Sequence, residues 1–152
     1  MKVNIYIETT WRGPRHMPGT YEFVMEAYVS DDKDPVTLTK ATYADDSTEN
    51  TAYVMAAAEA VNRLNTKCDV CFYTPNRFFN AAINEYFPKW RQNGFTTSKK
   101  EPVANALLWQ QIAEKVTAVS ATDVPHQYRN CMKSDVRRLN TKYRAKRGRQ
   151  KK

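Results

Sequence analysis

Hydrophobic and polar residues alternate along three stretches near the start of the chain, as they do in strands with one buried face. These stretches are residues 3–7, 20–29 and 36–42. The segments between them, residues 12–19 and 30–35, are rich in Gly, Pro and Asp, which interrupt regular structure. The pattern predicts three consecutive antiparallel strands joined by hairpin connections.

The period of the hydrophobic positions then changes from strand-like to helical. Tyr53, Ala57, Val61 and Leu64 recur at helical spacing, which predicts a helix over residues 48–64. A short apolar stretch at residues 68–73 follows and predicts a fourth strand. Alternation of helix and strand implies a crossover onto a parallel neighbour.

The second half of the chain continues this alternation. Helices are predicted at residues 77–85 and 89–92, separated by Pro88, and Gly94 is expected to end the second one. Pro102 is well placed to begin another helix. A fifth strand at 118–124 and a last helix at 128–141 complete the order β-β-β-α-β-α-α-α-β-α, which is that of an α/β domain.

Composition supports one compact domain without a membrane segment. The chain has 152 residues, of which 41% are hydrophobic, enough to bury a sizeable core. No stretch approaches the roughly 20 apolar residues of a membrane helix, and the first ten residues lack the layout of a secretory signal. Three cysteines are too few and too uneven for a disulfide framework. We therefore expect a soluble, cytoplasmic protein.

The net charge of +8 lies mostly at the C-terminal end. Residues 142–152 contain seven Lys or Arg and no acid, which leaves about +1 for the rest. We expect a folded domain at residues 1–141 and a basic, flexible tail at 142–152. The tail either only increases solubility or acts as an arm that contacts phosphates.

Residues 76–110 resemble type 1 ribonuclease H closely and without gaps. That family has an aromatic residue and a Trp four positions apart, then a Gly-aromatic-Lys-Thr segment, then Lys-Pro-Val-x-Asn-x-x-Leu-Trp. The matching residues are Tyr86, Trp90, Gly94, Phe95, Thr97, Lys100, Pro102, Val103, Asn105, Leu108, Trp109 and Gln110. The resemblance extends more weakly over residues 3–139. It implies a ribonuclease H-like fold: a five-stranded mixed sheet, with three antiparallel strands plus parallel strands, flanked by helices.

The resemblance also implies where four metal-binding carboxylates should lie. Active members use them to hold two divalent metals that hydrolyse the RNA strand of an RNA/DNA hybrid. The four positions here carry Glu8, Tyr53, Pro75 and Asp135. His126 lies near the place of a family histidine that assists product release, although it could equally be an ordinary loop residue.

Two of these positions have lost their acidic group. A neutral phenol is a poor ligand for Mg²⁺, and proline has no side-chain oxygen. Only Glu8 and Asp135 remain, and Glu8 is longer than the usual Asp. We therefore expect a catalytically degenerate member, with Mg²⁺ or Mn²⁺ as a cofactor only if the protein is active.

Positions that contact substrate in the family have survived better. Thr48 and Asn50 match a phosphate-contacting segment, Arg77 replaces a substrate-contacting Gln, and Tyr86 replaces an aromatic residue that lies against the DNA strand. A basic protrusion is represented by Lys89, Arg91, Lys99 and Lys100. Each has a structural alternative: Thr48 and Asn50 can cap a helix, Tyr86 can belong to the core, and lysines can simply be solvated.

Three functions follow from these observations. The first is a non-catalytic module that binds an RNA/DNA hybrid or another duplex, since such grooves are recognised by shape, phosphates and 2′-hydroxyls. The second is an active hybrid endoribonuclease with a rearranged metal site. The third is a structural or protein-interaction module, for which the sequence names no partner.

Overall fold

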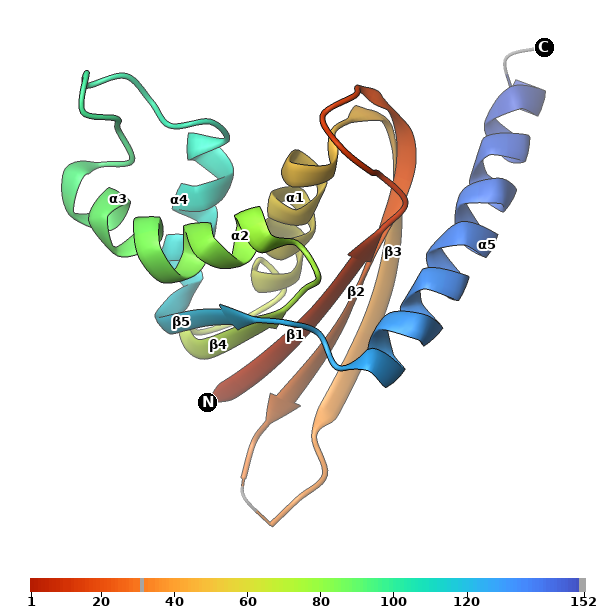
Figure 1. Cartoon of the computed structure of the whole chain (residues 1–152). Helices are drawn as coiled ribbons and strands as arrows, with labels where there is room; N and C mark the ends of the chain where they lie inside the picture. Colours follow the sequence, from red (N-terminus) through yellow and green to blue (C-terminus); the bar gives the residue numbers. More distant parts are fainter. Residues whose placement is uncertain (31, 151–152) are drawn as a thin grey trace.

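The computed structural model describes residues 1–30 and 32–150, without the side chains of residues 149 and 150 (Figure 1). The described residues form a five-stranded sheet in the order β3-β2-β1-β4-β5. Its strands are β1 (Lys2–Thr9), β2 (Met17–Tyr28), β3 (Val36–Ser47), β4 (Cys68–Tyr73) and β5 (Val116–Thr122). β1, β2 and β3 pair antiparallel, and β4 pairs parallel with both β1 and β5. The predicted mixed sheet is confirmed.

The strands differ from the prediction mainly at their ends. β3 continues to Ser47, five residues beyond its predicted end at residue 42. The reason is pairing with the start of β2, where Met17 lies opposite Ser47 and Gly19 opposite Ala44. Sequence periodicity cannot anticipate such an extension, because it depends on the partner strand.

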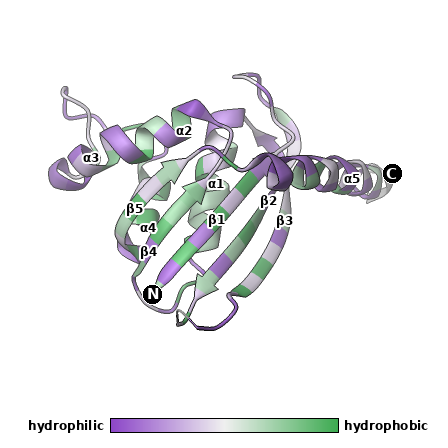
Figure 2. Ribbon diagram, turned by 60° about the horizontal axis from the view of Figure 1, so that its bottom comes forward, coloured by the Kyte–Doolittle hydropathy of each residue, from purple (hydrophilic) through white to green (hydrophobic). Residues whose placement is uncertain are grey.

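The two faces of the sheet pack against different helices. Val3, Ile5 and Ile7 of β1 are fully buried on the face covered by α1 (Glu49–Val61). The alternate residues, including Tyr6 and Glu8, face the last helix, and this alternation of polar and apolar residues along the strands is visible in Figure 2. The sheet therefore separates an apolar core from a second, more polar layer.

Helix α1 begins at Glu49 because Thr48 caps it. The Thr48 side chain accepts a hydrogen bond from the backbone N–H of Thr51, at 3.4 Å. Five buried alanines of this helix allow it to lie close to the sheet: Ala52, Ala56, Ala57, Ala58 and Ala60.

After β4 come three short helical segments that are continuous with one another. They are α2 (Arg77–Ala81), the π-helix η1 (Ala82–Tyr86) and α3 (Phe87–Asn93). Pro88 was expected to interrupt the helix, but it lies in the first turn of α3, where its missing N–H costs little. Gly94, at φ 76°, ends α3 in the left-handed conformation as predicted.

Helix α4 (Ala106–Lys115) begins four residues later than Pro102. Residues before it form extended structure instead, because Thr96 bridges to Pro102 and the N–H of Val103 donates to the carbonyl of Phe95 at 3.0 Å. Trp109 of α4 then closes an aromatic core against Phe79, with 5.8 Å between ring centroids.

Helix α5 (His126–Gln150) runs nine residues beyond the expected end at residue 141, so residues 142–150 of the expected flexible tail are helical. The extension lies along β3, where Tyr143 contacts Tyr43 edge to face and Arg147 pairs with Asp45. Residues 151 and 152 of the predicted tail lie outside the described residues. Within the described part of the chain, no helix is both long and apolar enough to cross a membrane.

Candidate functional site

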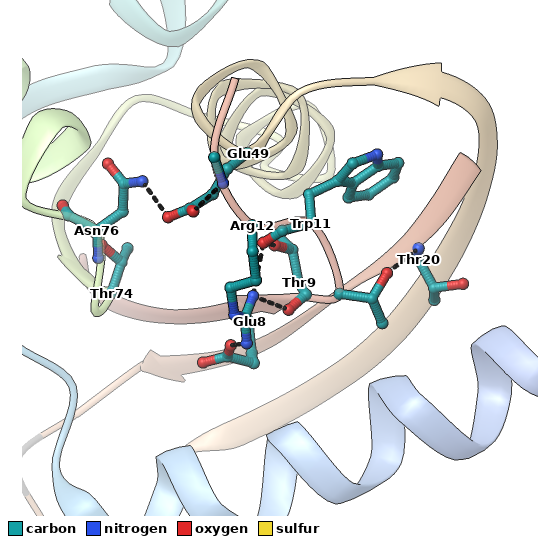
Figure 3. A network of polar contacts seen from close by, with 10 residues as sticks. Glu8, Thr9, Trp11, Arg12, Thr20, Glu49, Thr74 and Asn76 are labelled. Atoms are coloured by element: carbon teal, nitrogen blue, oxygen red, sulfur yellow. Dashed lines mark hydrogen bonds and ion pairs between the residues drawn. The ribbon is translucent and has the colours of Figure 1, made fainter. Parts of the chain in front are cut away.

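Glu8 is a buried acid at the end of the central strand β1. The residue is 1% exposed, and its Oε1 accepts a hydrogen bond from Nη2 of Arg12 at 3.1 Å (Figure 3). Its Oε2 is buried without a partner among the described residues. Burial raises the pKa of Glu8, against the opposing charges of Arg12 and Arg129. The one acid kept on β1 is thus held in an ion pair.

Arg12 is fixed over this carboxylate by the backbone that follows β1. Its Nη1 donates to the carbonyls of Thr9 and Trp11, at 2.7 and 2.6 Å. Three hydrogen bonds therefore hold the guanidinium in a single place, although the side chain is half exposed. Arg12 was not among the residues predicted from the sequence. The sequence pattern that could have indicated it is a basic residue four positions after Glu8.

Tyr53 lies on α1, where the charge of Glu8 acts on it. The residue is 1% exposed, and its ring packs near Phe79 at 6.4 Å between centroids. Burial, and then the negative charge of Glu8, raise the pKa of Tyr53 above its ordinary value. The phenol consequently stays neutral and brings no anionic ligand to the site.

Asn76, directly after Pro75, connects three separate segments. Its Nδ2 donates to Oε2 of Glu49 at 2.9 Å and to Oδ1 of Asn50 at 3.1 Å. Oε1 of Glu49 in turn accepts from the N–H of Gly13 at 2.8 Å (Figure 3). This network joins the end of β4, the start of α1 and the loop after β1.

Thr48 and Asn50 have structural roles in this arrangement. Thr48 caps α1, and the side-chain oxygen of Asn50 accepts from Asn76. The helix-capping alternative is confirmed for Thr48. Contact of either residue with a phosphate stays a prediction.

Asp135 lies on α5. It is 41% exposed and pairs with Arg138 at 3.8 Å. Its charge acts on Glu22, which lies opposite Glu8 in the β1–β2 register. Among the described residues, no group of three or more His, Cys, Asp or Glu side chains is arranged to hold a metal ion.

Glu22 is a buried acid that sequence reasoning did not select. It is 3% exposed, and its Oε1 has no partner within the described part of the chain. Burial, and then the charge of Asp135, raise the pKa of Glu22 to about 7. The sequence feature that could have indicated Glu22 is an acidic residue in the middle of a long predicted strand.

The raised pKa of Glu22 makes stability depend on pH. The folded state binds the Glu22 proton more tightly than the unfolded chain, whose carboxyl titrates near 4.5. The free energy of unfolding should therefore fall as pH rises from about 4.5 to about 7. Glu22→Gln should remove this loss and make the protein roughly 3 kcal/mol more stable than the parent at pH 8.

Urea unfolding of both proteins at pH 4 and pH 8 measures the effect. Glu114→Gln, which changes an exposed acid, is the control and should leave the pH profile of the parent unchanged. Parallel pH profiles for Glu22→Gln and the parent would show that Glu22 titrates normally.

Pro75 and His126, two of the predicted site residues, meet at a separate polar pocket of about 280 Å³. Arg77, Asp123, Val124 and Arg129 also line it. The structure thus brings Arg77 and His126 together from α2 and α5, which the sequence alone did not place side by side.

Of the four residues in the predicted basic protrusion, Arg91 makes contacts within the fold. Arg91 donates to the carbonyls of Ala113 and Val116, at 3.2 and 3.1 Å, and lies over the ring of Phe87. These contacts give Arg91 a structural role. The side chains of Lys89, Lys99 and Lys100 are exposed.

Tyr86 is on the surface next to this protrusion. It is 49% exposed and stacks on Trp90, with 5.9 Å between ring centroids. Trp90 in turn packs against the buried Trp109 at 5.4 Å. Tyr86 therefore presents one edge of the aromatic core to solvent.

The fold is that of ribonuclease H-like proteins. It resembles the crystal structure of LC9-RNase H1, a type 1 RNase H, with a TM-score of 0.62 and 18% identity, covering 93% of this chain and 71% of that one. It also resembles the solution structure of the PFV RNase H domain, with a TM-score of 0.57 and 18% identity, covering 93% and 92%.

Sequence comparison places the chain within this class. Residues 15–127 match the sequence model of the RNase H family, and the chain belongs to that family. The ribonuclease H of Pseudomonas fluorescens is 38% identical over 76 residues, which are 50% of this chain and 51% of that protein. That of Stutzerimonas stutzeri is 39% identical over 71 residues, 47% of each.

The matched regions do not include every position of the candidate site. The chain spans about half the length of the curated relatives it matches. Tyr53 and Pro75 fall within the family match, whereas Glu8 and Asp135 lie outside it. The assignment of these two acids therefore depends on their places at the end of β1 and on α5.

Proposed function

We propose that this chain binds nucleic acid, as an RNA/DNA hybrid or another duplex, without cleaving it. The observation that carries the proposal is the ion pair of Arg12 with Glu8, a buried acid with the uncharged Tyr53 beside it. A guanidinium bound to Oε1 competes with a metal for that oxygen of the carboxylate. The family resemblance supplies the nucleic acid as ligand.

The donor set does not fit the two-metal site of the family. Mg²⁺ prefers several carboxylate or water oxygens in octahedral geometry. Of the four positions, Glu8 is paired with Arg12, Tyr53 is neutral, Pro75 has no donor and Asp135 is near Glu22.

One observation favours a second candidate, an active nuclease with a rearranged site. Glu22 lies opposite Glu8 and next to Asp135, and both glutamates have one buried oxygen without a partner among the described residues. In such an enzyme Glu22 would replace one of the missing acids. Glu22→Gln would then abolish cleavage.

The test combines binding and cleavage of a labelled RNA/DNA hybrid. We expect binding that weakens steeply with salt, because phosphate contacts release counterions. We also expect cleavage in Mg²⁺ or Mn²⁺ to be no faster than that of Asp135→Asn. Metal-dependent turnover that disappears in Asp135→Asn or Glu22→Gln would support the nuclease, and no binding at low salt would support a protein-interaction role.

The basic end of α5 should contribute to this binding. Lys142, Arg144 and Lys146 are exposed, whereas Arg147 is paired with Asp45. Changing these three residues to Gln should weaken hybrid binding and reduce the slope of log K against log salt by about 0.9 for each phosphate that is no longer neutralised. An unchanged slope would mean that this segment only increases solubility.

A further inference from the structure

A small polar pocket lies between the end of β4 and the beginning of α5. Its volume of about 280 Å³ equals that of roughly nine water molecules. Arg77, His126 and Arg129 provide its hydrogen-bond donors, and Asp123 provides one carboxylate. The pocket therefore has room for one small anion and its hydration water.

The two arginines of this pocket have hydrogen-bond donors that are available to a ligand. Neither Arg77 nor Arg129 belongs to an ion pair found among the described residues. Nε of Arg129 is buried and has no hydrogen-bond partner in that part of the chain. Buried donors in native proteins are nearly always paired, so this N–H of Arg129 is available to a ligand or an ordered water.

The pocket is electrostatically connected to the candidate site. The charge of Arg129 acts on Glu8, as does that of Arg12. Pro75, at a position where the family has a carboxylate, is part of the pocket wall. Positive side chains thus gather where the family resemblance places anionic metal ligands.

We propose that Arg77, Arg129 and His126 form a phosphate-binding pocket that takes one phosphate group of the nucleic acid. The identification of the ligand's source rests on the proposed function. A guanidinium donates two parallel hydrogen bonds to phosphate oxygens, and an imidazole adds a third donor. Direct binding by these side chains replaces the metal-mediated contact expected for the family.

Removing the charge of Asp123 should have the opposite effect on phosphate binding to removing the charge of an arginine. Its carboxylate lines the same pocket and repels an anion. Asp123→Asn should therefore tighten phosphate binding, whereas Arg77→Gln and Arg129→Gln should weaken it. Arg77 is exposed, so its loss does not threaten the fold. Arg63→Gln, which changes an exposed arginine in the turn after α1, is the control with the same charge change.

Inorganic phosphate is the first probe. We expect it to raise the melting temperature of the parent more than chloride does at equal ionic strength. The shift should disappear in Arg77→Gln and Arg129→Gln, increase in Asp123→Asn and persist in Arg63→Gln.

Labelled RNA/DNA hybrids with either a 5′-phosphate or a 5′-hydroxyl are the second probe. Arg129→Gln should weaken binding about tenfold, the effect of losing a charged hydrogen bond, and more than Arg63→Gln does. A loss confined to the phosphorylated hybrid assigns the pocket to a terminal phosphate. An equal loss for both assigns it to a phosphate within the strand.

The outcomes separate this inference from the proposed function. If both pocket arginine variants match Arg63→Gln in phosphate response and in hybrid binding, the pocket is not a phosphate site. If the parent binds no hybrid but responds to phosphate through Arg77 and Arg129, the pocket stands and the proposed function is wrong.

Discussion

Gly19→Ala should destabilise the protein by about 3 kcal/mol, because no side chain fits at this point of β2. A Cβ there would lie 2.6 Å from Cε2 of Trp11 and 2.7 Å from Oγ1 of Thr10. Neither neighbour can move easily. Trp11 is fully buried and its Nε1 donates to the carbonyl of Met17 at 2.6 Å, while Oγ1 of Thr10 accepts from the N–H of Thr20 at 2.9 Å.

This substitution should also disturb the candidate site. Arg12 follows Trp11 directly and depends on its carbonyl for one of its hydrogen bonds. Displacement of the indole should therefore loosen the guanidinium from Glu8. The same variant thus tests both the packing of this corner and its connection to the site.

Urea and thermal unfolding measure the loss, with Gly148→Ala as the control. Gly148 lies in α5 with nothing within 4 Å of an added Cβ, so Ala there should stabilise by up to about 1 kcal/mol. A double-mutant cycle with Trp11→Phe isolates the clash, because a smaller ring should relieve part of it. A loss below about 0.5 kcal/mol for Gly19→Ala, within the range of neutral surface substitutions, would show that Trp11 yields easily.

Rebuilding four carboxylates should create magnesium-dependent stability, and this is the second large effect we expect. The variant combines Tyr53→Glu, Pro75→Asp and Arg12→Ala. The first two restore acids at the family positions. The third releases Glu8, whose carboxylate is otherwise bound by Arg12. None of the single changes should suffice, because metal ligands act as a unit.

Without metal the rebuilt site should be unstable. Tyr53 is buried, so Tyr53→Glu places a charge next to Glu8 in a region that already raises the pKa of Glu8 by burial. Mg²⁺ at about 100 times its dissociation constant should return roughly 2.7 kcal/mol. The melting temperature of the variant should therefore rise with Mg²⁺ far more than that of the parent.

Cleavage of a labelled hybrid is the second readout, since a misplacement of about 1 Å can reduce a rate roughly 100-fold. Glu8→Asp should be added if the first combination binds metal but does not cleave. The matched control carries Asp135→Asn in the same background and should lose both effects. A folded variant that neither binds Mg²⁺ nor cleaves would contradict our assignment of the four positions.

The order of helices and strands could be predicted well from the sequence, but the composition of the site could not. Alternation located the first three strands, since it reflects which face of a strand is buried, and a short apolar stretch located the fourth. The family resemblance implied that Tyr53 and Glu8 belong to one site, and in the structure the charge of Glu8 acts on Tyr53. Arg12 escaped notice, because its role depends on the course of the loop after β1 and not on a local pattern.

Some expectations about residues changed when their neighbours became known. Thr48 caps a helix and Arg91 holds carbonyls of α4 and β5, although both match substrate-contacting positions of the family. A side chain binds whatever partner the fold brings within hydrogen-bond distance. For a polar residue on a helix, sequence spacing does not identify that partner.

The sequence by itself determined the α/β class, the start of α1 at Thr48, the end of α3 at Gly94 and membership of the ribonuclease H family. These depend on local propensity and on patterns within short windows. Only the tertiary structure decided that Arg12 binds Glu8, that Glu22 lies near Asp135, and that Arg77, His126 and Arg129 share a pocket. Each of these contacts depends on the path of a loop, the register of a strand or the position of a helix. The free energy of such a contact depends on burial and on distance, and a local sequence pattern contains neither.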